Sequence, residues 1–132
     1  MAGQQTPHAA KDGRKQLGAA GERLAAERLR TAGYVIRAMN YRCAFGEVDI
    51  IAEEGGDVVF VEVKTRRGVA FGLPEEAVTP AKQRKLIATA QTYLAETETP
   101  EASWRIDVVG VALSAAGKLE EVRIHRHALS AE

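Results

Sequence analysis

The stretch from Gly46 to Arg67 constrains the fold of this chain more than any other part of the sequence. Two apolar runs are joined by Glu54-Gly55-Gly56-Asp57, an arrangement that is typical of a β-hairpin. Each run alternates between two faces of a strand. In the first run, one face carries Val48, Ile50 and Ala52, and the other carries Glu47, Asp49, Ile51 and Glu53. In the second run, one face carries Val59, Val61 and Val63, and the other carries Val58, Phe60, Glu62, Lys64 and Arg66.

The two glycines at the centre of the turn fix which residues of the two strands face each other. The resulting register pairs Asp49 with Glu62 and Glu47 with Lys64, all on one face. Directly opposed carboxylates repel, so something must compensate for this pair. A divalent metal would do so, because Mg²⁺ binds to one or two carboxylates together with waters and substrate phosphates. Lys64 could then orient or deprotonate a water, or stabilise charge on a phosphate.

The same side chains would also fit a solvated polar face of a half-exposed hairpin. We favour the metal site because the second strand, Val58 to Val63, carries apolar residues on both faces. Such a strand is expected to be central and buried, where unpaired charge is costly.

Length and composition limit the remaining possibilities. The 132 residues predict a flexible N-terminal tail over residues 1–12 and a single domain over residues 13–132. Eighteen basic residues balance eighteen acidic ones, so nucleic acid could be bound only by a local basic patch. The single cysteine, Cys43, excludes an internal disulfide and favours a reducing compartment. No apolar run approaches the roughly 20 residues that span a bilayer, and no signal-peptide core is present, so we expect a cytoplasmic protein.

Periodicity predicts further helices and strands on both sides of the hairpin. The expected elements are a helix over residues 13–32, a strand over 34–42, a helix opened by Thr79-Pro80, a central strand over 104–113 and an edge strand over 119–127. Because a loop and a helix precede it, the central strand should lie parallel to the second hairpin strand. It would bury Asp107, for which we expect an arginine, a lysine or a backbone amide as partner rather than a metal.

Two features of the first helix leave alternatives open. Glu22 lies at the border of the apolar stripe, where periodicity alone favours a solvated glutamate. From the same position it could also reach toward Asp49 and Glu62. Gly18 and Gly21 weaken the helix, which indicates close approach of the sheet or of a ligand on that side.

Basic residues gather in sequence after the hairpin and at the start of the second helix. They are Arg66, Arg67, Lys82 and Lys85, and we expect them to hold a nucleic-acid backbone, although a solvated helix face would explain the two lysines equally well. The intervening segment from Gly68 to Pro74 is either a mobile clamp on that backbone or only a long connection.

The motifs together resemble those of a bacterial protein family. The matching residues are Gly21-Glu22, Gly33-Tyr34, Asn40, Gly46-Glu47-Val48-Asp49, Phe60-Val61-Glu62-Val63-Lys64-Thr65-Arg66 and Pro74-x-Glu76-Ala77-Val78. This set resembles the YraN-type family, which is assigned to the restriction-endonuclease-like, or PD-(D/E)XK, nuclease superfamily, and is similar to archaeal Holliday-junction resolvases. The resemblance and the predicted order, αβββαββ, imply an α/β (α+β) fold with a central mixed sheet flanked by helices.

The resemblance also implies a metal-dependent catalytic site. Its members would be Lys64, Glu62, Asp49 and Glu22, with the Val63 carbonyl as a further ligand of Mg²⁺ or Mn²⁺. Glu47 would either pair with Lys64 or bind to the metal through water. None of these positions departs from the family's pattern. Holliday-junction resolvases are dimers, so the resemblance adds a homodimer to the expectations.

These residues favour a metal-dependent endonuclease that acts on structured DNA, branched or flapped. One alternative is a DNA-binding or DNA-processing accessory module that uses the nuclease fold without catalysis. Another is a ribonuclease with the same metal chemistry. The complete set of acidic residues and lysine favours catalysis, since binding alone does not require two opposed carboxylates.

Overall fold

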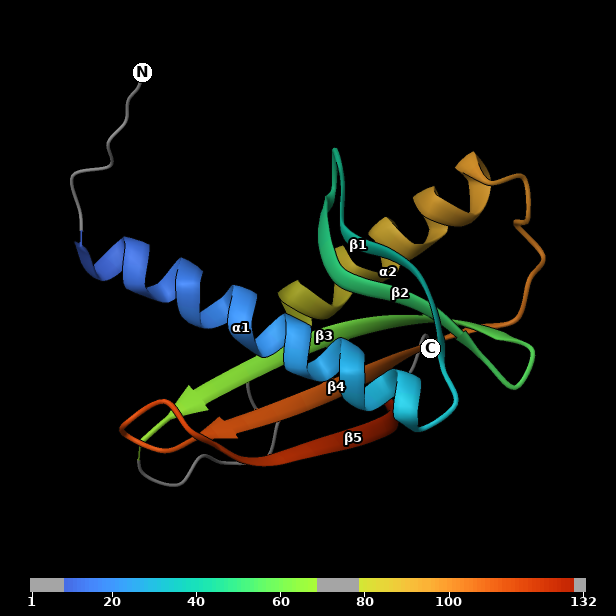
Figure 1. Cartoon of the computed structure of the whole chain (residues 1–132). Coiled ribbons are helices and arrows are strands. Elements are labelled where there is room, and N and C mark those ends of the chain that lie inside the picture. The colour runs from blue at the N-terminus through green and yellow to red at the C-terminus, as the bar shows by residue number, and fades with distance from the viewer. Residues whose placement is uncertain (1–8, 69–78, 130–132) are drawn as a thin grey trace, which may run out of the picture.

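The computed structural model describes residues 9–68 and 79–129, with the backbone alone for residues 9–17 and 129. Over these ranges the chain forms a five-stranded sheet and two helices (Figure 1). In order they are α1 (Ala9–Thr31), β1 (Val35–Cys43), β2 (Gly46–Glu54), β3 (Asp57–Arg67), α2 (Pro80–Glu96), β4 (Trp104–Leu113) and β5 (Leu119–Leu129). The predicted order αβββαββ is confirmed. Neither described helix combines the length and the apolar character that a membrane crossing requires.

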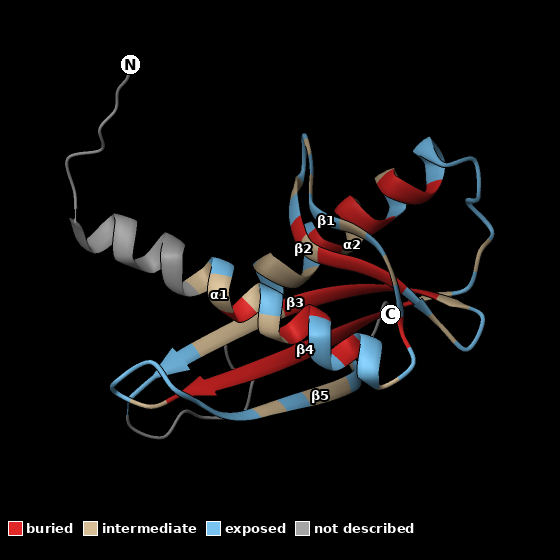
Figure 2. Ribbon diagram, viewed as in Figure 1, coloured by how far each residue is buried: buried red, intermediate tan, exposed pale blue. Residues whose placement is uncertain are grey.

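The strands lie in the sheet in chain order, from β1 at one edge to β5 at the other. Strands β1 to β3 form an antiparallel meander, and β5 pairs antiparallel with β4. Strand β4 pairs in parallel with β3, as expected from the helix between them. Almost all of β4 is buried, and β3 is buried over its first half (Figure 2).

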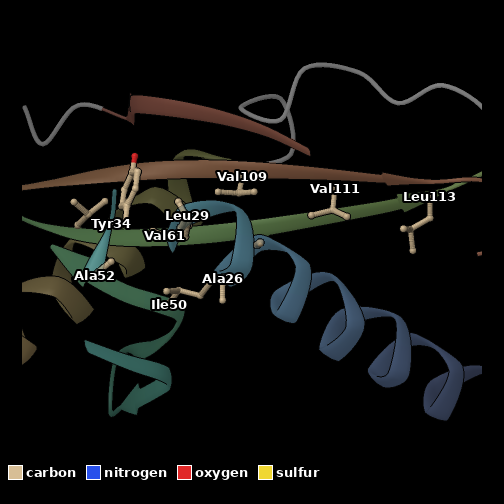
Figure 3. Packing of buried hydrophobic residues seen from close by; sticks show 11 residues of the cluster. Ala26, Leu29, Tyr34, Ile50, Ala52, Val61, Val109, Val111 and Leu113 are labelled. Atoms are coloured by element: carbon tan, nitrogen blue, oxygen red, sulfur yellow. The ribbon is translucent and has the colours of Figure 1, made fainter. Parts of the chain in front are cut away.

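Helix α1 covers one face of the sheet. Its buried residues Ala25, Ala26 and Leu29 share a cluster with Val61 of β3 and Val109 of β4 (Figure 3). The positions of Ala25 and Leu29 fit the helical spacing, and that of Val61 fits the predicted alternation of its strand.

Helix α2 covers the opposite face. Its residues Leu86, Ala90, Tyr93 and Leu94 pack in a second cluster around the fully buried Phe60 of β3. The Phe60 ring meets the rings of Tyr93 and Trp104 edge to face, each at 5.8 Å between centroids. This separation lies within the favourable range of roughly 4.5–7 Å.

The hairpin has the predicted register, but only over the half next to its turn. The recorded pairs run from Glu54 and Asp57 to Ile50 and Val61. Beyond Ile50, β2 leaves β3 while staying paired with β1. The ribbon of β1 and β2 therefore curves away from the rest of the sheet (Figure 1).

Two predictions for this stretch are wrong for that reason. Asp49 and Glu62, and likewise Glu47 and Lys64, are not partners in the strand ladder, because the strands separate before they reach these positions. Val48 was expected to share a face with Ile50, yet it packs in the α2 cluster. A twisted two-stranded ribbon turns its side chains progressively from one side of the sheet to the other.

Helix α1 begins at Ala9 instead of Gly13, so residues 9–12 belong to the helix and not to a tail. Alanine is the strongest helix former, and two alanines stand at this start. Gly21 is buried against β3, where an added Cβ would lie 1.9 Å from Thr65 Oγ1. The expected close approach of the sheet is confirmed there, but not at Gly18, which has nothing within 4 Å of an added Cβ.

Asp107 is fully buried on β4 and has the kinds of partner that were predicted. Arg105 Nε donates to its Oδ1 at 2.9 Å, and the backbone N–H of His127 donates to the same oxygen at 2.9 Å. The Tyr34 hydroxyl donates to Oδ2 at 2.7 Å. Both oxygens of this buried carboxylate therefore have hydrogen-bond donors, as buried polar groups require.

The same buried arginine joins the hairpin turn to the central strands. Arg105 Nη1 lies 2.9 Å from Asp57 Oδ2, and its Nη2 donates to Glu54 Oε1. From β5, Arg126 Nη2 lies 2.6 Å from Glu54 Oε2. These ion pairs hold the pKa of Glu54 at about 2, chiefly through the hydrogen bond from Arg126.

Candidate functional site

The candidate site begins where β2 leaves β3. In a continued ladder Val63 would bond to the backbone of Val48, but the strands have separated there. Instead, Val63 N–H donates to Asp49 Oδ2 at 2.7 Å, so a side chain takes the place of a strand partner. The Val63 carbonyl points toward the same neighbouring strand as its N–H. The opening in the sheet therefore presents both the Asp49 carboxylate and the predicted carbonyl ligand.

Glu62 lies beside this opening on the α2 face of β3 and is only 7% exposed. Its Oε2 is 3.2 Å from Lys64 Nζ and 3.0 Å from Lys82 Nζ. Lys64 follows two residues later on the same face of the strand, and Lys82 comes from the first turn of α2. Two cations thus flank one buried carboxylate.

The Asp49 carboxyl has a strongly perturbed protonation equilibrium. Burial, and after it the negative charge of Glu62, raises its pKa from 3.8 to about 7. Glu22 and Glu47 add to the rise, while the Val63 amide opposes it. Negative charge is therefore concentrated around Asp49, and a cation bound there would relieve the repulsion.

The two lysines differ in their proton affinity. Burial, together with the neighbouring Lys82, lowers the pKa of Lys64 in spite of the opposing effect of Glu62. Burial acts in the same direction on Lys82, but its contacts with Lys64 and Glu62 outweigh burial and raise its pKa. Lys64 is consequently the lysine from which a proton is more easily removed.

Glu22 reaches the site from α1. The bare Cα of Gly21 lets the helix lie directly on β3 at Thr65, and Glu22 follows as the next residue. It is half-buried and close enough to Asp49 for its charge to raise the pKa of that carboxyl. The structure thus places Glu22 near the predicted pair, which periodicity alone did not favour.

Glu47 has a different partner from the one considered in the sequence. Its Oε1 accepts a hydrogen bond from Arg42 Nε at 2.9 Å, and the two residues are ladder partners of β1 and β2. The side chain of Glu47 is 57% exposed. Its ion pair is with Arg42, so the suggested pairing with Lys64 is not formed.

The donor set at the opening fits a hard divalent cation. Asp49, Glu62 and the Val63 carbonyl offer only oxygen ligands, and Asp49 Oδ2 is already oriented by the Val63 amide. Among the described side chains, those of residues 18–68 and 79–128, no group of three or more histidines, cysteines, aspartates or glutamates is arranged to hold a metal. A site with two carboxylates is nevertheless sufficient for Mg²⁺, which keeps several waters and binds to substrate phosphates.

The four basic residues predicted to bind nucleic acid differ in their surroundings. Lys82 is bound to Glu62. Arg67 Nε donates to the Ala115 carbonyl at 3.2 Å, at the turn between β4 and β5. Arg66 and Lys85 are exposed. The predicted clamp lies outside the described residues except for Gly68, as does the motif from Pro74 to Val78.

A pocket of about 380 Å³ lies between the start of β2 and the first turns of α2. Its described lining residues are Gly46, Glu47, Thr79, Ala81, Lys82, Lys85 and Leu86. The pocket and the place of Lys82 in the site were both missed in the sequence. The available signal was the basic first turn of the helix that follows β3, capped by Thr79 with Pro80 at its first position, since a crossover helix must return over the same sheet.

The fold and the site define a mixed α/β domain in which adjacent strands supply two carboxylates and a lysine. The model of the uncharacterised protein family UPF0102 matches residues 21–111, so the chain belongs to this family and the YraN-type resemblance is confirmed. A UPF0102 protein of Caldicellulosiruptor saccharolyticus is 42% identical over 115 residues, covering 87% of this chain and 98% of the relative. One from Symbiobacterium thermophilum is 50% identical over 105 residues, covering 80% and 89%.

A solved structure is also similar to this chain. It is the SfsA protein of Pyrococcus furiosus in complex with Ca²⁺, with a TM-score of 0.41 and 18% sequence identity. The similarity covers 86% of this chain and 63% of that one.

Proposed function

We propose that this chain is a metal-dependent endonuclease that hydrolyses phosphodiester bonds of structured DNA, either branched or flapped. The observation that supports this proposal is the meeting of Asp49 and Glu62 at the opening between β2 and β3, with Lys64 bound to Glu62. Burial and mutual repulsion make the pair unfavourable without a cation, as the raised pKa of Asp49 indicates.

In this proposal Asp49, Glu62 and the Val63 carbonyl hold Mg²⁺ or Mn²⁺. The metal would supply Lewis-acid stabilisation of phosphate charge and would make an attacking water more acidic. The Val63 amide keeps Asp49 oriented, and Lys82 holds Glu62 in place from α2. Lys64 places or deprotonates the attacking water, a role that suits its lowered pKa.

DNA would be held through its backbone and not through its bases. We assign the phosphate contacts to two exposed cations, Arg66 near the end of β3 and Lys85, which lines the pocket beside Lys82. Such contacts position a substrate without reading its sequence, which agrees with selection by DNA shape.

The test is cleavage of labelled four-way, flapped, single-stranded and duplex DNA, and of a matched RNA, with Mg²⁺, Mn²⁺ or EDTA. Glu62→Gln and Lys64→Ala run beside wild type, and Glu120→Gln, at an exposed carboxylate of β5, serves as the matched control. We expect metal-dependent cutting that falls by about 10²- to 10³-fold in each site variant and is unchanged in the control. Cutting that persists in both site variants would refute the assignment.

A second candidate is a DNA-binding accessory module without turnover. It is favoured by the two lysines on Glu62, since an ion network of this kind can stabilise a buried carboxylate without a metal. Salt-sensitive DNA binding that is equal in wild type and Glu62→Gln, with no cutting of any substrate, would support this module and count against the nuclease. Cleavage of the RNA alone would instead identify a ribonuclease.

A further inference from the structure

We infer that the pocket between β2 and α2 binds a single unpaired nucleotide next to the phosphate to be cut. This inference rests on the proposed nuclease function and names the feature of DNA that the site selects. A nucleotide that is free of a base pair, as in a flap or at a branch point, would enter the pocket. A nucleotide within a regular duplex would first have to leave its stack.

The pocket adjoins the carboxylates directly through Lys82. This lysine lines the pocket and at the same time lies 3.0 Å from Glu62 Oε2. A phosphate held at the mouth of the pocket would therefore face the opening that holds Asp49.

The lining combines the two chemistries that a nucleotide requires. Gly46, Ala81 and the buried Leu86 offer apolar or backbone surface against which a flat base can pack. Lys82 and Lys85 offer positive charge for its phosphate. Aromatic bases are held by stacking and apolar contact, whereas the phosphate is held by charge.

Size and shape also favour one nucleotide. The volume of about 380 Å³ falls near the lower end of the roughly 300–1,000 Å³ that is usual for small-molecule sites. Gly46 lies close to α2, because a Cβ added there would lie 3.4 Å from Thr89 Oγ1 and 3.9 Å from Lys85 Cβ.

The test measures binding without catalysis. Thymidine 5′-monophosphate, 2-deoxyribose 5-phosphate and inorganic phosphate are titrated into the full chain in EDTA, and backbone amide shifts are followed by NMR. Ala81→Met fills the pocket from an exposed helix position, and Ala95→Met makes the same change at an exposed position near the other end of α2. We expect shifts centred on Gly46, Ala81 and Lys85 for the nucleotide. Its affinity should fall by about tenfold in Ala81→Met and stay unchanged in Ala95→Met.

Two results would overturn the inference. Equal binding of nucleotide and inorganic phosphate would identify an anion site without a place for the base. Nucleotide shifts that remain in Ala81→Met would place the binding elsewhere. If the nucleotide binds as expected but no DNA is cut in the substrate panel, the pocket stands and the nuclease proposal fails. The two ideas can therefore be separated.

Discussion

Replacing Asp49 by asparagine removes the most perturbed charge of the site while leaving its orienting contact possible. The asparagine carbonyl can still accept the Val63 N–H bond that Asp49 Oδ2 accepts at 2.7 Å. In the wild type the pKa of Asp49 rises from 3.8 to about 7 on folding. At about 1.4 kcal/mol for each pH unit, this rise corresponds to about 4 kcal/mol of lost stability when the carboxylate is ionised.

Because folding raises the pKa of Asp49, the direction in which stability changes with pH can be derived. Between pH 4 and pH 7 the folded protein retains a proton on Asp49 that the unfolded chain has released. The stability of the wild type therefore falls as pH increases through this window and is level above it. Asp49→Asn lacks this contribution, so we expect it to be more stable than wild type at pH 8 by between about 1 and 4 kcal/mol. The upper figure is a ceiling because the carboxamide is itself desolvated.

Urea unfolding at pH 5 and pH 8 measures this difference. A second arm adds Mg²⁺ at pH 8, where a ligand at 100 times its Kd stabilises a protein by about 2.7 kcal/mol. We expect wild type to gain stability and Asp49→Asn to gain none, with Glu120→Gln behaving as wild type. If Asp49→Asn is less stable than wild type at pH 8, the ionised Asp49 carboxylate does not destabilise the fold and the reasoning is refuted. An equal response of both proteins to Mg²⁺ would exclude Asp49 as a ligand.

Three further predictions address the surroundings of the site. Gly21→Ala should destabilise the chain by about 1–3 kcal/mol in urea, because the new methyl group would clash with Thr65 of β3. Gly18→Ala, where nothing lies near the new methyl group, should stabilise it by about 0.5–1 kcal/mol. Equal effects of the two substitutions would contradict the close packing at Gly21. Asp107→Asn should cost about 1–3 kcal/mol in urea, since it weakens the hydrogen bonds that Arg105, Tyr34 and the His127 amide donate to this buried carboxylate; an unchanged stability would contradict this. Lys82→Ala should raise the pKa of Lys64, measured by NMR at Nζ, because it removes a neighbouring cation that adds to the effect of burial; an unchanged pKa would show that the two lysines do not interact.

Much of the hairpin could be predicted because its determinants are local. Two glycines set the turn, and alternation then set the register from Glu54 and Asp57 inward. Where this register ends could not be predicted, since β2 separates from β3 only after Ile50 and no local pattern marks that point. The alternating pattern continues through Val48 as if the strand stayed flat.

The candidate site was predictable in its acidic residues but not in its arrangement. Asp49 and Glu62 follow from the strand pattern together with the family motif, whereas Lys82 joins them only because α2 returns over β3. The path of a long crossover cannot be read from periodicity, so Lys82 was assigned to the DNA backbone. The position of Glu22 could not be predicted for a similar reason. It depends on the contact of Gly21 with Thr65, which lies far away in the sequence.

The buried guanidinium of Arg105 bears on how the protein acquires its structure during synthesis. Its partners Glu54 and Asp57 lie in the first hairpin, while Arg126, which also binds to Glu54, belongs to the last strand. When only the first three strands have left the ribosome, these carboxylates lack their cations and the hairpin lacks its parallel neighbour. Contacts so distant in sequence are slow to form and are established late. We therefore expect the domain to fold cooperatively after its last strand emerges, so that a chain cut short before β5 gains little stable structure.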